Sequence, residues 1–284
     1  MMRSRSHIQL AAERRPGHAL AMITANWAAV FVALVWLLKV PNLPLPVYVL
    51  GFVFIAVQQH ALSMWLHEAS HWLLFEGKAL NDVFADIVLA NPLYVSTYAY
   101  RIRHLDHHRY LGDPTTDANQ VIFISLRGWR FYAFIVRCLL GIRFIEMTWQ
   151  YVTASKNRNM PWLSMCVVQL VILAAFTWAA GWKSYFWFWL LPFVTVFQLV
   201  ASLRCIIEHQ TLEGETPPFT RNLYPTLLER FLFCRAGFDY HWVHHVWMDI
   251  PCFNVREFSL DKENAQTTPV ESYFATLRRL IATN

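Results

Sequence analysis

Residues 47–71 read VYVLGFVFIAVQQHALSMWLHEASH. The first twenty of them contain no Asp, Glu, Lys or Arg, and about twenty helical residues cross the apolar core of a bilayer. Two histidines, His67 and His71, follow where this apolar run ends. Residues spaced by four share one face of a helix, so the two imidazoles can bind one metal ion together. The stretch therefore predicts a membrane-spanning helix that ends in a metal-binding motif.

Three further apolar stretches are long enough to span a membrane, at residues 21–38, 162–180 and 185–203. The Pro-rich connection 39–46 joins the first of them to the helix above, and residues 181–184 join the other two. Connections of this length allow only a tight turn outside the bilayer. The sequence thus predicts four transmembrane helices arranged as two hairpins.

Composition and charge agree with a membrane protein. Hydrophobic residues make up 56% of the chain and charged residues only 15%, against about 25% in soluble domains. Of the 24 Lys and Arg, only Lys39 and Lys183 fall in the two short turns. Because Lys and Arg accumulate on the cytoplasmic side, we expect both termini and the middle segment there. The basic residues form no run typical of nucleic-acid binding, so no nucleic-acid partner is expected despite the net charge of +5.

Two shorter segments are expected outside the spans. Residues 83–95 are apolar but too few to cross a bilayer, and they contain Asp86 and Pro92, which indicates an interfacial or half-buried segment. Residues 268–271 read TPVE, a helix N-terminal cap, and apolar residues follow at helical spacing. This pattern predicts a short amphipathic helix that packs on the cytoplasmic domain or lies on the membrane.

The expected architecture is a single all-α domain over residues 1–284. It is an integral membrane bundle of four helices with a cytoplasmic helical cap that carries the histidines. Its parts are a basic N-terminal segment (1–20), the first hairpin (21–66), a cytoplasmic segment (67–160), the second hairpin (161–204) and a cytoplasmic C-terminal region (205–284).

Nine of the twelve histidines lie at or beyond the predicted span ends, all on the cytoplasmic side of the predicted topology. The pattern HxxHH occurs at 104–108 and at 241–245, and His209 follows the fourth span. In HxxHH we expect the first two histidines to share a helix face and the third to reach a neighbouring ion. One ion takes at most six ligands, so nine imidazoles indicate two ions, and imidazole suits Fe, Zn, Cu or Ni. The predicted ligands are His67, His71, His104, His107, His108, His209, His241, His244 and His245.

Two other metal-site interpretations fit less of the sequence. Residues 67–71 also match HExxH, the motif of zinc metalloproteases, with Glu68 as the general base. A protease would need one zinc and would leave both HxxHH motifs and His209 without a role. A haem-binding bundle would place facing histidines inside the spans, whereas these lie beyond the span ends.

Three histidines remain outside the predicted ligand set. His60 precedes His67 by seven residues, so it lies on nearly the same helix face but about 10 Å away. That distance is too great for the same ion, and His60 is either functional or held by a buried hydrogen bond. His7 and His18 lie in the basic N-terminal stretch and are expected to be ordinary surface residues.

The three motifs resemble the histidine boxes of the membrane-bound fatty acid desaturase superfamily, a group of non-haem diiron enzymes. The resemblance rests on residues 67–71, 103–110 and 239–245, and it covers most of the chain, from about 47 to 254. It implies oxidation of an unactivated C–H bond by O2 at two iron ions. It also implies a lipid-like substrate in a setting of membrane lipids, and electrons from an external ferredoxin- or cytochrome-type donor.

The resemblance leaves the substrate open among fatty acyl chains, carotenoids, alkanes and small amphiphiles. We expect desaturation of a fatty acyl or similar chain, with hydroxylation or ketolation as the alternative. Five arginines after the second motif either bind an anionic head group or anchor the protein at the membrane surface: Arg109, Arg127, Arg130, Arg137 and Arg143. Carboxylates near the histidines are candidates to orient the imidazoles. They are Glu68, Asp106, Asp113, Asp117, Glu208 and Asp239.

Overall fold

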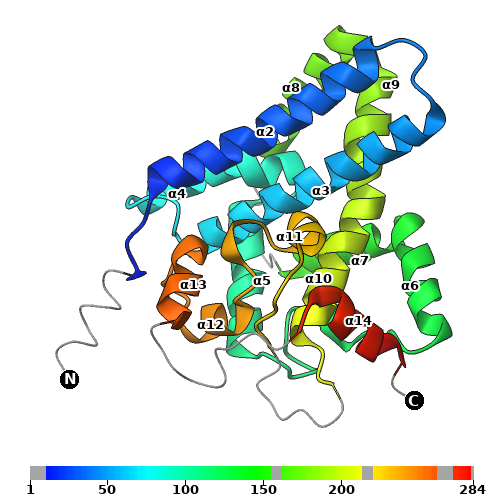
Figure 1. Cartoon of the computed structure of the whole chain (residues 1–284). Helices are drawn as coiled ribbons and strands as arrows, with labels where there is room; N and C mark the ends of the chain where they lie inside the picture. Colours follow the sequence, from blue (N-terminus) through cyan, green and yellow to red (C-terminus); the bar gives the residue numbers. More distant parts are fainter. Residues whose placement is uncertain (1–10, 155–161, 213–219, 261–270, 283–284) are drawn as a thin grey trace.

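The computed structural model of the protein describes residues 11–154, 162–212, 220–260 and 271–282. Every regular element in these residues is a helix (Figure 1). Four helices are long and apolar enough to cross a membrane, as predicted: α2 (Pro16–Lys39), α3 (Leu45–Ser70), α8 (Trp162–Ala180) and a continuous fourth helix, Trp182–His209.

The fourth helix is not a regular α-helix throughout. It begins as α9 (Trp182–Tyr185), continues through two π-helical turns, η4 (Phe186–Leu190) and η5 (Phe193–Phe197), and ends as α10 (Gln198–His209). Pro192, which has no N–H to donate, lies between the two π-helical turns. The widened turns therefore accommodate the proline without ending the helix.

Both helices that lead into the histidines extend beyond their apolar runs. α3 continues to Ser70, four residues past the predicted span, so His67 lies in its last turn. α10 continues to His209, six residues past the predicted span. Hydropathy marks only where apolar side chains stop, whereas these polar ends remain helical because they are buried against other helices.

The four long helices bring their short connections to one end of the molecule (Figure 1). α2 packs against α3, and α8 packs against α9. The Lys39 ammonium group donates a hydrogen bond of 2.7 Å to the carbonyl oxygen of Ala179, which places the two turns side by side. α12 (His241–Val246), α13 (Cys252–Leu260) and α14 (Tyr273–Ala282) lie at the opposite end. Which end faces the cytoplasm stays a prediction.

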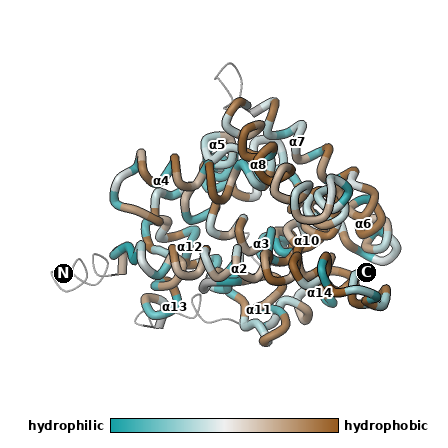
Figure 2. The backbone as a smooth tube through the Cα atoms, turned by 90° about the horizontal axis from the view of Figure 1, so that it is seen from above, coloured by the Kyte–Doolittle hydropathy of each residue, from teal (hydrophilic) through white to brown (hydrophobic). Residues whose placement is uncertain are grey.

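The outward faces of the long helices carry apolar side chains. Leu163 and Trp178 of α8 are 79% and 91% exposed. Figure 2 shows hydrophobic residues along α8. Such exposure of large apolar side chains is unfavourable in water and is expected where lipid covers them.

The segment that was expected at the interface is helical and packs against the bundle. It contains α4 (Lys78–Ala85), a π-helical turn, η1 (Asp86–Ala90), and a 3-10 turn, η2 (Asn91–Leu93). η1 contacts α3, and both η1 and η2 contact α8. The Asp86 carboxylate accepts a hydrogen bond of 2.7 Å from the Thr97 backbone N–H, at the start of α5 (Thr97–Arg109). This segment thus connects the membrane-capable helices to the helix that carries the second histidine motif.

The remaining helices form the wall around the ends of α3 and α10. They are η3 (Gln120–Phe123), α6 (Trp129–Leu139), α7 (Ile142–Ala154), α11 (Leu227–Phe233) and η6 (Arg235–Gly237). The predicted C-terminal amphipathic helix is confirmed as α14, which packs on α10. Its predicted cap lies mostly outside the described residues. Tyr273 of α14 is fully buried and stacks on Phe233, with ring centroids 5.2 Å apart.

Candidate metal centre

The nine histidines predicted as ligands come together from four helices. α3 provides His67 and, directly after its end, His71, while α10 provides His209 as its last residue. α5 begins with a cap in which the Ser96 hydroxyl accepts a hydrogen bond from the Ala99 N–H. The other six histidines lie on α5 and α12: His104, His107, His108, His241, His244 and His245.

The ring nitrogens of these histidines fall into two adjoining groups. Five imidazoles have nitrogens within 4.8 Å of one another, those of His67, His71, His104, His108 and His244. A second such set contains His107, His209 and His245, and a third contains His209 and His241 together with the Glu208 carboxylate. Because His209 belongs to both smaller sets, the nine imidazoles divide into a group of five and a group of four.

The distribution within the HxxHH motifs differs from the sequence expectation. In each motif the first and third histidines belong to one group, and the middle histidine, His107 or His244, belongs to the other. At about 100° per residue, positions i and i+4 diverge by only about 40°, whereas i and i+3 diverge by about 60° in the other direction. The i, i+4 pair therefore shares a face more closely, and the i+3 residue is free to reach the neighbouring group.

The distances between nitrogens fit metal coordination. In the first group the Nε2 atoms of successive residues His71, His104, His108 and His244 are 2.8, 3.0 and 3.2 Å apart. In the second group the Nε2 atoms of His107, His209, His241 and His245 are 3.3, 2.9 and 3.2 Å apart. Two imidazole nitrogens bound at right angles to one ion at about 2.1 Å are about 3.0 Å apart. The cluster thus matches the edges of two coordination shells.

Buried ring nitrogens without partners give a second indication of metal. Among the described residues, neither Nδ1 nor Nε2 of His67 has a hydrogen-bond partner, although the side chain is 2% exposed. A buried polar group without a partner is unfavourable by about 1–3 kcal/mol. An ion at the centre of the first group would give the His67 ring the partner that the protein does not provide.

The environment of several of these histidines favours the neutral imidazole, the form that binds metal ions. Burial, and secondarily the Arg101 guanidinium, lowers the pKa of His71 from 6.5 to about 4. Burial and the neighbouring imidazoles lower the pKa of His108 to about 2. The same causes hold the pKa of His244 well below its ordinary value. Protons therefore compete weakly with a metal ion at neutral pH.

At pH 5 the metal-free protein is expected to unfold several degrees lower than at pH 7.5. The folded-state pKa values of His71 and His108 lie below the unfolded value of 6.5, so the unfolded chain binds more protons at pH 5. Stability is therefore fully present above pH 6.5 and is lost as the pH falls toward 4. Thermal unfolding of the chelator-treated protein in detergent measures this effect. An equal melting temperature at both pH values would contradict the burial of neutral imidazoles.

Two of the six candidate carboxylates have an oxygen within 3.6 Å of a ring nitrogen of the cluster. Asp117 is 1% exposed, and its Oδ1 atom is 2.8 Å from Nδ1 of His107. It also accepts hydrogen bonds from the backbone N–H groups of Gly112 and Asn119. Asp117 is thus positioned to fix the orientation of the His107 ring. The Oε2 atom of Glu208 is 3.6 Å from Nε2 of His241, which places this carboxylate among the imidazole nitrogens.

The other candidate carboxylates have structural contacts. Glu68 accepts a hydrogen bond of 2.9 Å from the Cys252 backbone N–H at the start of α13, and its other oxygen is 3.8 Å from Nδ1 of His67. Asp239 accepts a hydrogen bond from Arg230. Asp113 is exposed, and hydrogen bonds from Thr115 in its own turn lower its pKa to about 2. Asp106 is half-buried on α5.

Glu208 has partners that the sequence did not indicate. Its Oε1 atom accepts hydrogen bonds of 2.8 Å from Nε of Arg204 and 2.7 Å from the Tyr273 hydroxyl. Arg204 precedes it by one helical turn, a spacing that an i, i+4 pattern could have revealed. Tyr273 comes from α14, 65 residues away, and no local pattern points to this contact.

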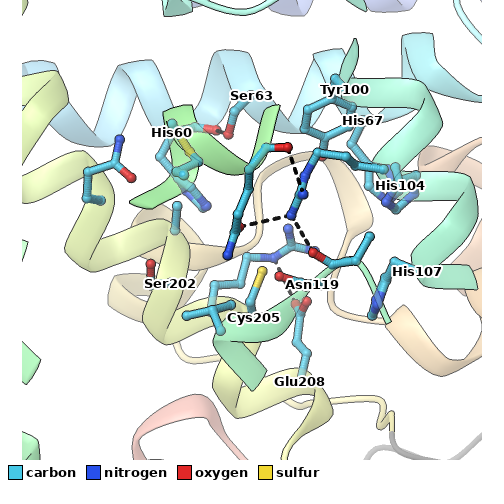
Figure 3. A pocket seen from close by; sticks show the side chains of 18 of the residues that line it. His60, Ser63, His67, Tyr100, His104, His107, Asn119, Ser202, Cys205 and Glu208 are labelled. Atoms are coloured by element: carbon cyan, nitrogen blue, oxygen red, sulfur yellow. Dashed lines mark hydrogen bonds and ion pairs between the residues drawn. The ribbon is translucent and has the colours of Figure 1, made fainter. Parts of the chain in front are cut away.

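A cavity of about 160 Å³ adjoins the cluster. Five of the nine histidines line it, and so do side chains of α3, α5, α7 and α10. Figure 3 shows His60, Ser63 and Ser202 at this cavity, opposite His104 and His107. His60 is 2% exposed, and its Nδ1 atom has no hydrogen-bond partner in the described part of the chain. The buried hydrogen bond expected as one alternative is present, to the backbone of Leu232, and His60 also lines the cavity.

A family model described as fatty acid desaturase matches residues 43–270, most of the chain and all three histidine motifs. The chain belongs to this family. A dihydrorhizobitoxine desaturase of Bradyrhizobium elkanii is 28% identical over 227 residues, which cover 72% of this chain and 64% of the relative. A zeaxanthin 4-ketolase of Chlamydomonas reinhardtii is 24% identical and covers 83% of this chain.

A third relative, a sphingolipid delta(4)-desaturase of Mus musculus, is 32% identical over 122 residues, 41% of this chain. The chain spans less than two thirds of the length of each of these three relatives. They have different named substrates, so the family assignment does not identify the substrate of this chain. Membership of the fatty acid desaturase family agrees with the resemblance of the three histidine motifs to the boxes of that superfamily.

Two histidines in the basic N-terminal stretch stay outside the site. His18 is exposed, and its ring centroid is 5.3 Å from that of Phe253. His7 lies outside the described residues. The surface interpretation thus holds for His18.

Proposed function

We propose that the protein is an O2-dependent membrane oxidoreductase that holds two iron ions in the nine-histidine cluster and desaturates an unactivated carbon–carbon bond. The observation that carries this proposal is the convergence of nine imidazoles from four helices into two adjoining groups with coordination-like spacing. Membership of the fatty acid desaturase family supports it. A two-ion site uses all nine histidines, whereas the zinc protease interpretation leaves most of them unused.

The nine histidines would form two ligand sets, one for each iron ion. His67, His71, His104, His108 and His244 would bind one ion. His107, His209, His241 and His245 would bind the other, with Glu208 as a further oxygen ligand or hydrogen-bond partner. Asp117 would hold the His107 ring in place through Nδ1, which leaves Nε2 to face the ion.

An iron pair supplies the activation of O2 for attack on a C–H bond. Desaturation removes two hydrogen atoms from adjacent carbons. O2, with two electrons from an external donor of the ferredoxin or cytochrome type and two protons from the solvent, is then reduced to two molecules of water. The protein contributes the buried position of the cluster and a cavity that orients the substrate against it. Hydroxylation, with the same electrons and one molecule of water as the by-product, is the second candidate, since one relative is a ketolase.

Elemental analysis of the purified, detergent-solubilised protein is expected to give about two iron ions per chain. About one zinc and no iron would contradict the proposal and favour the protease, with Glu68 as its general base. If two zinc ions are found, reconstitution with ferrous iron decides. Uptake of two irons, with O2 consumption on addition of a chemical reductant, supports the oxidoreductase, and failure to bind iron excludes it.

A further inference from the structure

The cavity beside the cluster is small. Its volume of about 160 Å³ is close to that of an engineered cavity of about 150 Å³ that admits benzene in another protein. The cavity therefore has room for about ten non-hydrogen atoms. The pocket is partly open, so this volume limits the part of a substrate that lies beside the cluster.

The cavity is also positively charged. Three guanidinium groups from three different helices line it, Arg103 of α5, Arg143 of α7 and Arg204 of α10. Among the described residues that line the cavity, Glu208 is the only carboxylate. The residues that line the wall thus provide three guanidinium groups and one carboxylate. Guanidinium groups are not expected in the wall of a tunnel for an alkyl chain, because burial of an unpaired charge is unfavourable.

The partners of these arginines do not fully neutralise them. Arg103 donates hydrogen bonds to the carbonyl oxygens of Ala118 and Gln150 and to the Gln150 side chain, all of which are neutral acceptors. Arg204 is 6% exposed and donates through Nε to Glu208. Its Nη2 atom is buried and has no hydrogen-bond partner in the described part of the chain. A buried guanidinium nitrogen of this kind is available to donate a hydrogen bond to an anionic group in the cavity.

Arg143 has a shared partner. It is 7% exposed, and its Nη1 atom is 3.0 Å from Glu146, while its Nε atom is 3.4 Å from the Ser202 hydroxyl. The exposed Arg137 also pairs with Glu146, so one carboxylate serves two guanidinium groups. Of these two arginines, only Arg143 lines the cavity.

The rest of the wall is partly apolar. Met64, Val121, Met147, Phe197 and Ala201 line the same cavity as the arginines. Figure 3 places His67, His104 and His107 at it as well, so any molecule in the cavity lies against the cluster. Cationic groups, an apolar wall and the predicted metal ligands thus surround one small space.

We propose that the substrate is a small amphiphile with a carboxylate, which binds to the guanidinium groups of Arg103, Arg143 and Arg204 while its alkyl part lies against the histidine cluster. Planar guanidinium groups match the geometry of a carboxylate and form two hydrogen bonds with it. This inference rests on the proposed function and narrows its substrate to molecules that carry a carboxylate close to the reacting carbon. Of the five arginines after the second histidine motif that were considered as head-group ligands, only Arg143 lines the cavity.

Isothermal titration of the iron-loaded protein in detergent with butanoate, hexanoate and glutamate tests the proposal without turnover. At least one of these carboxylates is expected to bind, and methyl hexanoate, the uncharged counterpart of hexanoate, is expected to bind at least about tenfold more weakly than hexanoate. Arg143→Gln should weaken carboxylate binding by about 10- to 100-fold, and Arg143→Lys should weaken it less. Arg130→Gln is the matched control, since it removes an exposed positive charge of α6 that does not line the cavity, and it should leave the Kd unchanged.

Three results would overturn the substrate assignment. These are binding of none of the three carboxylates, equal binding of hexanoate and its methyl ester, and an unchanged Kd in Arg143→Gln. The ester comparison uses only the wild-type protein, so it decides even if the Arg143 variants do not fold. Tighter binding of stearoyl-CoA than of any small carboxylate would also refute the assignment and leave the proposed function intact. Carboxylate binding in a protein that takes up no iron would count against the proposed function alone.

Discussion

Replacement of His244 by alanine is expected to remove about one iron per chain and to reduce turnover by roughly three orders of magnitude or more. His244 is the one residue of the third histidine motif that joins the group of five imidazoles. It is 3% exposed, and its Nε2 atom is 3.2 Å from that of His108. Alanine leaves no donor atom at this position, and no other residue of α12 belongs to the first group. Loss of one ion disables a reaction that needs both.

Iron content and O2 consumption of the purified variant measure this effect. His18→Ala is the matched control, because His18 is exposed and lies against Phe253, away from the cluster. The control should keep both irons and full O2 consumption. A His244→Ala protein with two irons and unchanged turnover would show that the grouping of the imidazoles is not the grouping of ligands.

Replacement of Glu208 by alanine is expected to lower the free energy of unfolding by about 3–5 kcal/mol and to weaken iron binding. The ion pair of Glu208 with Arg204 is buried, with side chains 1% and 8% exposed and a separation of 2.8 Å. Alanine leaves the guanidinium of Arg204 in the interior without a carboxylate. It also leaves the buried hydroxyl of Tyr273 without its acceptor.

A double variant separates the structural contribution from the effect on the metal. Arg204→Met together with Glu208→Ala removes both charges, so most of the stability should return. Iron binding should remain weakened, because the Glu208 oxygen that lies 3.6 Å from His241 is still absent. Chemical denaturation and iron titration of the single and double variants measure the two effects. Full iron affinity in the double variant would show that Glu208 serves only to neutralise Arg204.

The metal-ligand candidates were predictable because their signals are local. His67 and His71 are four residues apart at the end of an apolar run, and their helical spacing follows from the sequence alone. The same is true of the two HxxHH motifs. The expected pairing within these motifs was wrong, since i, i+4 neighbours share a group and His107 and His244 cross to the other one.

The sequence by itself determined four apolar helices, a C-terminal amphipathic helix and nine histidines near the span ends. Hydropathy and helical periodicity depend only on neighbouring residues, so these features can be identified without knowledge of the packing. The sequence also suggested a second metal ion, because nine imidazoles exceed the ligand number of one.

Only the tertiary structure decided which imidazoles face each other and what surrounds them. The contact of Tyr273 with Glu208 joins residues 65 positions apart. The cationic cavity combines Arg103, Arg143 and Arg204, which no spacing in the sequence connects. Such contacts depend on how α5, α7, α10 and α14 pack around the end of α3, and packing is set by the shapes of many side chains at once. The nature of the substrate cavity is therefore a property of the fold and not of any motif.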